Sequence, residues 1–153
     1  MRSLLLVALT IFVTLGYIAV PVLFQFLPKP EAGEIAGVYL NTAHWIMLFA
    51  VILVWMLAVK RFQGAEKVRW RLHLPCLFLL LMECGQLFII SPEMKALKAQ
   101  AFLQTGQHLN QASSQWAHFA MLHGISQLLY LTSCLLALYC FFALNRLQRA
   151  TVL

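Results

Sequence analysis

Three side chains that could carry chemistry lie inside long apolar segments of the chain: His44, Glu83 and His123. An ionised acid at the centre of a bilayer costs about 2.5–3.5 kcal/mol on insertion scales. Glu83 therefore needs a cationic partner or a proton. His44 and His123 lie eight residues after the starts of their spans, and Glu83 lies eight residues before Ser91, which follows its span. Because successive spans run in opposite directions, these ends meet the same side of the membrane. At 1.5 Å per residue, this places all three about 12 Å below one membrane surface.

Polar companions follow on the same helical faces, three or four residues away. They are Gln86 after Glu83, and Ser126 and Gln127 after His123. Such a polar stripe is expected to face the interior of a helix bundle and to leave the other faces to lipid. The sequence thus predicts an interior cluster with the members His44, Glu83, Gln86, His123, Ser126 and Gln127.

Two kinds of chemistry fit this cluster, and a structural role is the alternative. Histidine and carboxylate groups can relay protons, and His44, Glu83 and His123 could also bind Zn²⁺ or copper. The alternative is a set of interhelical hydrogen bonds of about 0.6 kcal/mol each that holds the bundle together. A haem between His44 and His123 has no other support in the sequence.

The composition requires a membrane around these residues. Of the 153 residues, 62% are hydrophobic and 10% are charged, whereas soluble domains contain about 45–50% apolar and ~25% charged residues. Four apolar segments reach the roughly 20 residues that span a bilayer. We expect an all-α, integral membrane four-helix bundle in one domain, residues 1–153, with spans at about 4–26, 35–59, 72–90 and 116–144.

The basic residues predict the orientation. Eight of the eleven Lys and Arg residues lie at the two ends of the chain and in the loop between the second and third spans. By the positive-inside rule, both termini are expected in the cytoplasm. The net charge of +6 then reflects this orientation, and we expect no nucleic-acid partner.

Local motifs add three expectations. Ser91-Pro92-Glu93 is typical of a helix start. It predicts a short amphipathic helix between the third and fourth spans, at the outer face of the membrane that the chain spans. Gly33 and Gly37 form a GxxxG motif that permits close helix approach. The cysteines lie within apolar segments, where reduced and buried thiols are expected; they are Cys76, Cys84, Cys134 and Cys140.

Three sequence blocks resemble a known family. Residues 16–37 contain Gly16 and Pro21, residues 91–97 begin with Ser-Pro, and residues 119–126 read Phe-x-x-Leu-His-Gly-x-Ser. These blocks resemble a small bacterial membrane domain family of unknown function, which is similar to the eukaryotic transmembrane protein linked to platinum-drug resistance. The resemblance implies a four-helix bundle and a role for His123 and Ser126, and it supplies no activity.

The sequence therefore predicts a polytopic inner-membrane protein that binds or relays a proton or a transition-metal cation through the interior cluster. The competing hypothesis is a non-catalytic accessory or assembly subunit of a larger membrane complex. The bilayer is an expected partner under both hypotheses, and a membrane-protein partner or a second copy of the chain is a further one. No motif in the sequence supports an enzyme.

Overall fold

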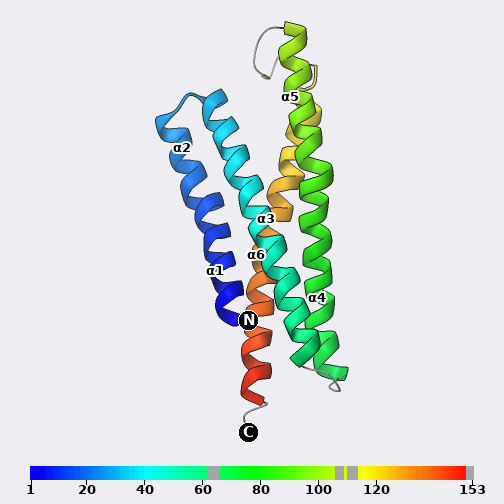
Figure 1. Ribbon diagram of the computed structural model, residues 1–153. Helices are drawn as coiled ribbons and strands as arrows, with labels where there is room; N and C mark the ends of the chain where they lie inside the picture. Colours follow the sequence, from blue (N-terminus) through cyan, green and yellow to red (C-terminus); the bar gives the residue numbers. More distant parts are fainter. Residues whose placement is uncertain (62–65, 106–108, 110–113, 151–153) are drawn as a thin grey trace.

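The structure, a computed structural model, describes residues 1–61, 66–105, 109 and 114–150, and this part of the chain is almost entirely helical (Figure 1). The elements are α1 (Arg2–Val13), the π-helical segment η1 (Thr14–Ala19), α2 (Val20–Phe26), α3 (Lys29–Arg61), α4 (Glu66–Gly85), the π-helical segment η2 (Gln86–Ile90), α5 (Ser91–Thr105) and α6 (Trp116–Ala150).

Four continuous helices in the described residues are long and apolar enough to cross a membrane. They are Arg2–Phe26, Lys29–Arg61, Leu72–Gln104 and Trp116–Arg146. The predicted all-α membrane bundle is therefore confirmed. The observed helices are longer than the predicted spans, most of all the third, which continues through α5.

Both termini lie at one end of the bundle, and α5 lies at the other (Figure 1). We call these the terminal end and the α5 end. Helices α1 and α4 each pack against α3 and α6. At the terminal end, the Arg2 guanidinium donates a hydrogen bond to Asn145 Oδ1, which joins α1 to α6.

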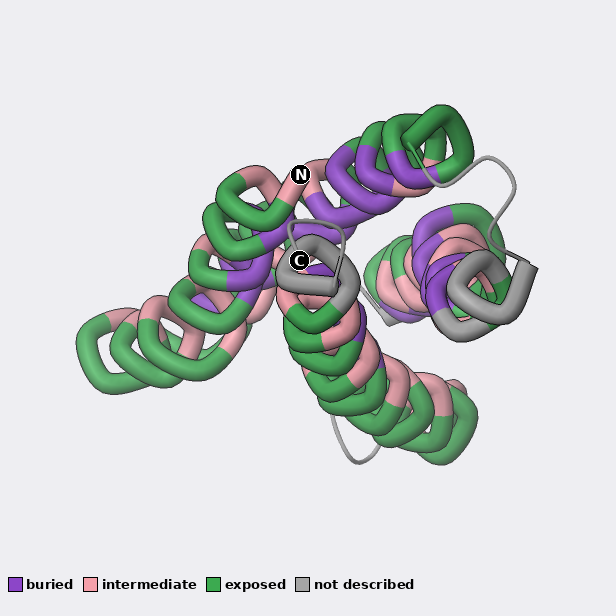
Figure 2. Tube along the Cα trace, turned by 90° about the horizontal axis from the view of Figure 1, so that it is seen from below, coloured by how far each residue is buried: buried purple, intermediate pink, exposed green. Residues whose placement is uncertain are grey.

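The outward faces of the helices are apolar, and the faces turned toward one another are buried (Figure 2). Small residues occupy many of the contact positions, among them Ala8, Ala43, Ala50 and Ala137, and they let helix backbones approach closely. Large apolar side chains that are more than half exposed cover the outside: Val7, Ile18, Val38, Phe49, Leu81, Ile89, Leu128 and Leu135. This surface fits contact with lipid, so the chain is a multi-pass membrane protein.

Two prolines follow the two π-helical segments. Pro21 comes just after η1, and Pro92 comes just after η2. Proline lacks an N–H group and its ring crowds the carbonyl four residues earlier, and the wider π turn accommodates that conflict without ending the helix. Ser91 accordingly has helical torsions (φ −63°, ψ −44°) and does not begin a new helix. The predicted helix after the third span is therefore present as α5, and it continues directly from that span.

The close helix approach occurs at a different glycine from the predicted pair. Among the described residues, no atom lies within 4 Å of an ideal Cβ at Gly33 or Gly37. A Cβ at Gly16 in η1 would instead overlap the ring and hydroxyl of Tyr130 on α6. Gly16 thus leaves the space into which Tyr130 packs.

Candidate functional site

The candidate site is centred on a buried contact between α3 and α4. His44 Nδ1 and Glu83 Oε2 lie 2.6 Å apart and share a hydrogen bond. The two residues are 3% and 0% exposed, respectively. A buried carboxylate without a partner is costly, so the imidazole beside it stabilises Glu83 in the interior.

Two aromatic rings contact His44. Phe12 of α1 meets the imidazole edge to face, with ring centroids 5.1 Å apart, and Tyr130 of α6 does so at 5.4 Å. Phe12 and Tyr130 stack on each other at 4.0 Å. The Tyr130 hydroxyl donates a hydrogen bond to the backbone carbonyl of Phe12, which fixes this ring beside the imidazole.

Two buried oxygen atoms next to the pair have no hydrogen-bond partner among the described residues. They are Glu83 Oε1 and Gln86 Oε1. The amide nitrogen of Gln86 is engaged, because Nε2 donates to Ser126 Oγ over 2.8 Å. Unpartnered buried acceptors are uncommon in proteins. A proton would satisfy Glu83 Oε1, and a hydrogen-bond donor or a cation would satisfy either atom.

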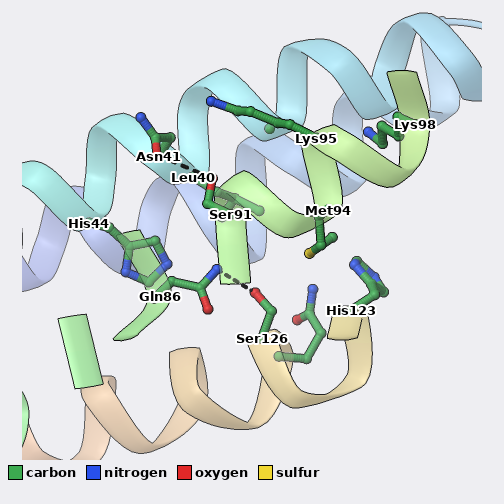
Figure 3. A pocket seen from close by; sticks show the side chains of 12 residues that line it. Leu40, Asn41, His44, Gln86, Ser91, Met94, Lys95, Lys98, His123 and Ser126 are labelled. Atoms are coloured by element: carbon green, nitrogen blue, oxygen red, sulfur yellow. Dashed lines mark hydrogen bonds between the residues drawn. The ribbon is translucent and has the colours of Figure 1, made fainter. Parts of the chain in front are cut away.

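A pocket of about 90 Å³ opens beside His44 and Gln86, toward the α5 end. Figure 3 shows His44 and Gln86 on one side of it, and Lys98 and His123 on the other. Ser91 Oγ donates a 3.5 Å hydrogen bond to Asn41 Oδ1 across its wall. Twelve residues line the pocket: Gly37, Leu40, Asn41, His44, Gln86, Ser91, Met94, Lys95, Lys98, His123, Ser126 and Gln127.

The structure brings five of the six cluster residues to this pocket and places the sixth, Glu83, behind His44. His123 is exposed at the α5 side, where its ring stacks on Phe119 with centroids 6.1 Å apart. Ser126 accepts the hydrogen bond from Gln86, and Gln127 is exposed on the pocket wall.

The α6 residue that contacts His44 is Tyr130, two helical turns beyond His123. In the described part of the chain, no three His, Cys, Asp or Glu side chains are grouped closely enough to hold a metal ion. The arrangement is thus a two-residue acid–base pair with a polar pocket beside it.

Sequence reasoning missed several residues of the site. Lys95 and Lys98 are two of them. Lys95 lies four residues after Ser91, and Lys98 lies three residues after Lys95, a spacing that indicates one shared helix face. Phe12 gave no signal, because an aromatic residue in an apolar span is usually a lipid-facing or packing residue. Its role follows only from its contacts with His44 and Tyr130.

Comparison with known proteins gives a family and no activity. A domain of unknown function, DUF4149, matches residues 4–102, which comprise the first three spans and the pair His44–Glu83. The block at residues 119–126 lies beyond the matched range. Neither the curated proteins nor the solved structures contain a match. Because the match covers more than half of the chain, the protein belongs to the DUF4149 family of domains of unknown function.

Proposed function

We propose that this membrane protein binds and releases a proton at the buried His44–Glu83 pair. The observation that carries the proposal is the 2.6 Å contact between Nδ1 and Oε2, with both residues buried inside membrane-spanning helices. With one shared proton beyond a carboxylate and a neutral imidazole, the pair is electrically neutral, and it becomes negative when that proton leaves. The polar pocket beside the pair gives the proton a route in and out.

The residues around the pocket favour a proton over a metal cation. Lys95 and Lys98 both line it, and none of the described residues that line it is acidic. Two ammonium groups repel a divalent cation by Coulomb interaction, while a proton can be passed along hydroxyl and amide groups. Binding of Zn²⁺ or copper at His44, Glu83 and His123 stays a prediction. Elemental analysis of the purified protein tests it.

The exchange is proposed to be one-sided. Between the His44–Glu83 pair and the terminal end, the buried side chains of the described residues are apolar or thiol groups, with Ser133 as the exception. A continuous proton path needs polar groups or water along its length. We therefore expect proton exchange with the α5 end and no proton conduction across the bilayer.

Infrared difference spectroscopy of the full-length protein in nanodiscs tests the proposal. A change of pH should alter the C=O stretching band of a buried carboxyl group, and Glu83→Gln should remove this band. Glu93→Gln is the matched control, because Glu93 is exposed on α5, and it should leave the band in place. An unchanged band in Glu83→Gln would overturn the proposal, as would stoichiometric Zn or Cu that is lost in that variant.

The orientation is part of the proposal. With the basic termini in the bacterial cytoplasm, the pocket faces the outer side of the inner membrane. Lys29→Cys at the α5 end should react with an impermeant thiol reagent added to intact cells, and Ser3→Cys at the terminal end should react only after lysis. The reverse pattern would place the pocket on the cytoplasmic side.

A further inference from the structure

The pocket has a second property that proton exchange does not use, which is a concentration of positive charge and hydrogen-bond donors. Lys95 and Lys98 of α5 line it, together with donor-bearing side chains from three helical segments: Asn41, Ser91, His123 and Gln127. In the part of the chain that the structure describes, the lining contains no acidic side chain. The carboxylate of Glu34 interacts electrostatically with Lys98, so part of the charge of one lysine is offset.

The size of the pocket limits what can enter. A volume of about 90 Å³ corresponds to roughly three water molecules. It therefore admits one compact polar group and not a large organic molecule. Ammonium groups with hydroxyl and amide donors around them are the side chains that recognise phosphate.

The surroundings of the pocket are apolar and face lipid. Val38 follows the pocket residue Gly37 and is 64% exposed, and Leu128 follows Gln127 and is 67% exposed. A ligand with a charged head in the pocket and hydrocarbon chains along α3 and α6 would match both surfaces. Such an arrangement is typical of a phospholipid, whereas free phosphate would use the pocket alone.

Gln86 adds an independent observation. The residue is 6% exposed, it lines the pocket, and its Oε1 has no hydrogen-bond partner among the described residues. Next to a bound phosphate, this acceptor would take a hydrogen bond from a hydroxyl group on the same head group. A glycerol head group supplies such a hydroxyl.

We infer that the pocket binds an anionic phosphate group, carried by a phospholipid of the membrane leaflet at the α5 end. Lys95 and Lys98 neutralise the phosphate, and Gln86 Oε1 accepts a hydrogen bond from a hydroxyl of the head group. This inference does not depend on proton exchange at Glu83.

Native mass spectrometry of the full-length protein in a neutral detergent tests the inference, with phosphatidylglycerol or phosphatidylcholine added at equal concentration. The wild-type protein should retain phosphatidylglycerol preferentially. In Lys95→Gln/Lys98→Gln, its affinity should fall about fivefold for each lysine lost, which corresponds to the attraction of one lysine to an anionic lipid surface. Lys95→Arg/Lys98→Arg should keep most of the affinity, because the charge and the donors remain.

The matched control is Lys29→Gln/Lys60→Gln, which removes two exposed lysines that do not line the pocket. It should retain phosphatidylglycerol as the wild-type protein does. If the pocket double variant does not fold, Lys95→Gln alone tests the same loss, because Lys95 is exposed. Equal retention of phosphatidylglycerol by the pocket variants and the wild type would overturn the inference, as would equal retention of the two lipids by the wild type.

Inorganic phosphate distinguishes the two sources of the phosphate group. Failure of millimolar phosphate to displace phosphatidylglycerol would support the lipid, with its hydrocarbon chains contributing to the affinity. Displacement of phosphatidylglycerol from the wild-type protein by millimolar phosphate would overturn the lipid as the source and would make free phosphate the ligand of the same site.

Discussion

The two halves of the bundle hold their helices together in different ways. Toward the α5 end, α3, α4, η2 and α6 meet through hydrogen bonds between side chains, such as His44–Glu83 and Gln86–Ser126. Toward the terminal end, the interior contains Leu5, Met47, Val54, Leu79, Ala137 and Leu144, all less than 2% exposed. The Sγ atoms of Cys76 and Cys140 lie 3.8 Å apart within that apolar region.

This difference indicates that the half toward the terminal end serves packing, whereas the half toward the α5 end, the polar half, contains the groups that could do chemistry. Lipid is as apolar as leucine, so the interior of the half toward the terminal end, the apolar half, associates by close packing of its side chains rather than by a hydrophobic driving force. The hydrogen bonds Arg2–Asn145 and Trp55–His73 join its helices outside this fully buried interior. The polar half includes buried groups that cost free energy wherever they lack a partner. A bundle that needed only to be stable could use apolar packing along its whole length, so the polar half is where function is expected.

Removing one member of the His44–Glu83 pair should have the largest effect on stability. Glu83→Leu leaves His44 buried without its partner, and breaking such a pair costs about 3–5 kcal/mol of the free energy of unfolding. His44→Leu/Glu83→Leu should recover most of that loss, because apolar replacement of both members is often neutral. Unfolding in mixed micelles measures both variants. A double variant as unstable as Glu83→Leu would indicate that the pair itself stabilises the polar half.

The second prediction concerns the boundary between the halves, where Tyr130 packs over Gly16. Gly16→Ala places a methyl group on the Tyr130 ring and should lower the free energy of unfolding by about 1–3 kcal/mol. Gly33→Ala is the control, because a Cβ there meets no described atom. It should be neutral or raise stability by about 0.5 kcal/mol.

A double-mutant cycle tests the cause of the Gly16 effect. In a Tyr130→Ala background, Gly16→Ala should cost much less, because the ring that it overlaps is gone. Equal costs of Gly16→Ala in the two backgrounds would show that Gly16 has another role.

The sequence was sufficient to predict four membrane-spanning helices, because an uninterrupted run of about 20 apolar residues is typical of a membrane-spanning helix. It also indicated the pocket residues His44 and Ser126, because polar groups inside a membrane cost free energy unless they have hydrogen-bonding partners. Residue counting along α6 placed His123 at the level of Glu83. The structure pairs Gln86 with Ser126, and because α4 and α6 run in opposite directions, the α6 residue level with Glu83 lies further along, at Tyr130.

The remaining details depend on helix geometry that a linear pattern does not encode. Ser91 and Pro92 carry the local signature of a helix start, but the π turn of η2 lets the helix continue through them. The GxxxG motif at Gly33 is equally local, and whether a partner helix approaches it depends on how α3 packs. Gly16 has no neighbouring small residue at four-residue spacing, so only the position of Tyr130 reveals its role.

The third prediction introduces a hydroxyl into the apolar half. Cys76 is 1% exposed, and its neighbours in the interior are mostly apolar. Cys76→Ser should lower the free energy of unfolding by about 1 kcal/mol, because burial of a hydroxyl without a good partner is unfavourable. Cys84→Ser, at a half-buried position beside Glu83, should cost less. Equal effects at the two cysteines would mean that the halves do not differ in polarity as described.

The smallest expected effect is the loss of one hydrogen bond in the polar half. Ser126→Ala removes the acceptor of Gln86 Nε2, and interhelical hydrogen bonds in membranes average about 0.6 kcal/mol. Thr132→Val on the same helix is the control, because Thr132 is exposed and bonds only to the Leu128 carbonyl one turn earlier. If Ser126→Ala leaves stability unchanged but alters the carboxyl band of Glu83, the hydrogen bond positions Gln86 for proton exchange. A loss of stability with an unchanged band would make the hydrogen bond a structural contact. The polar half would then serve to hold the bundle together, by hydrogen bonds where the apolar half uses packing.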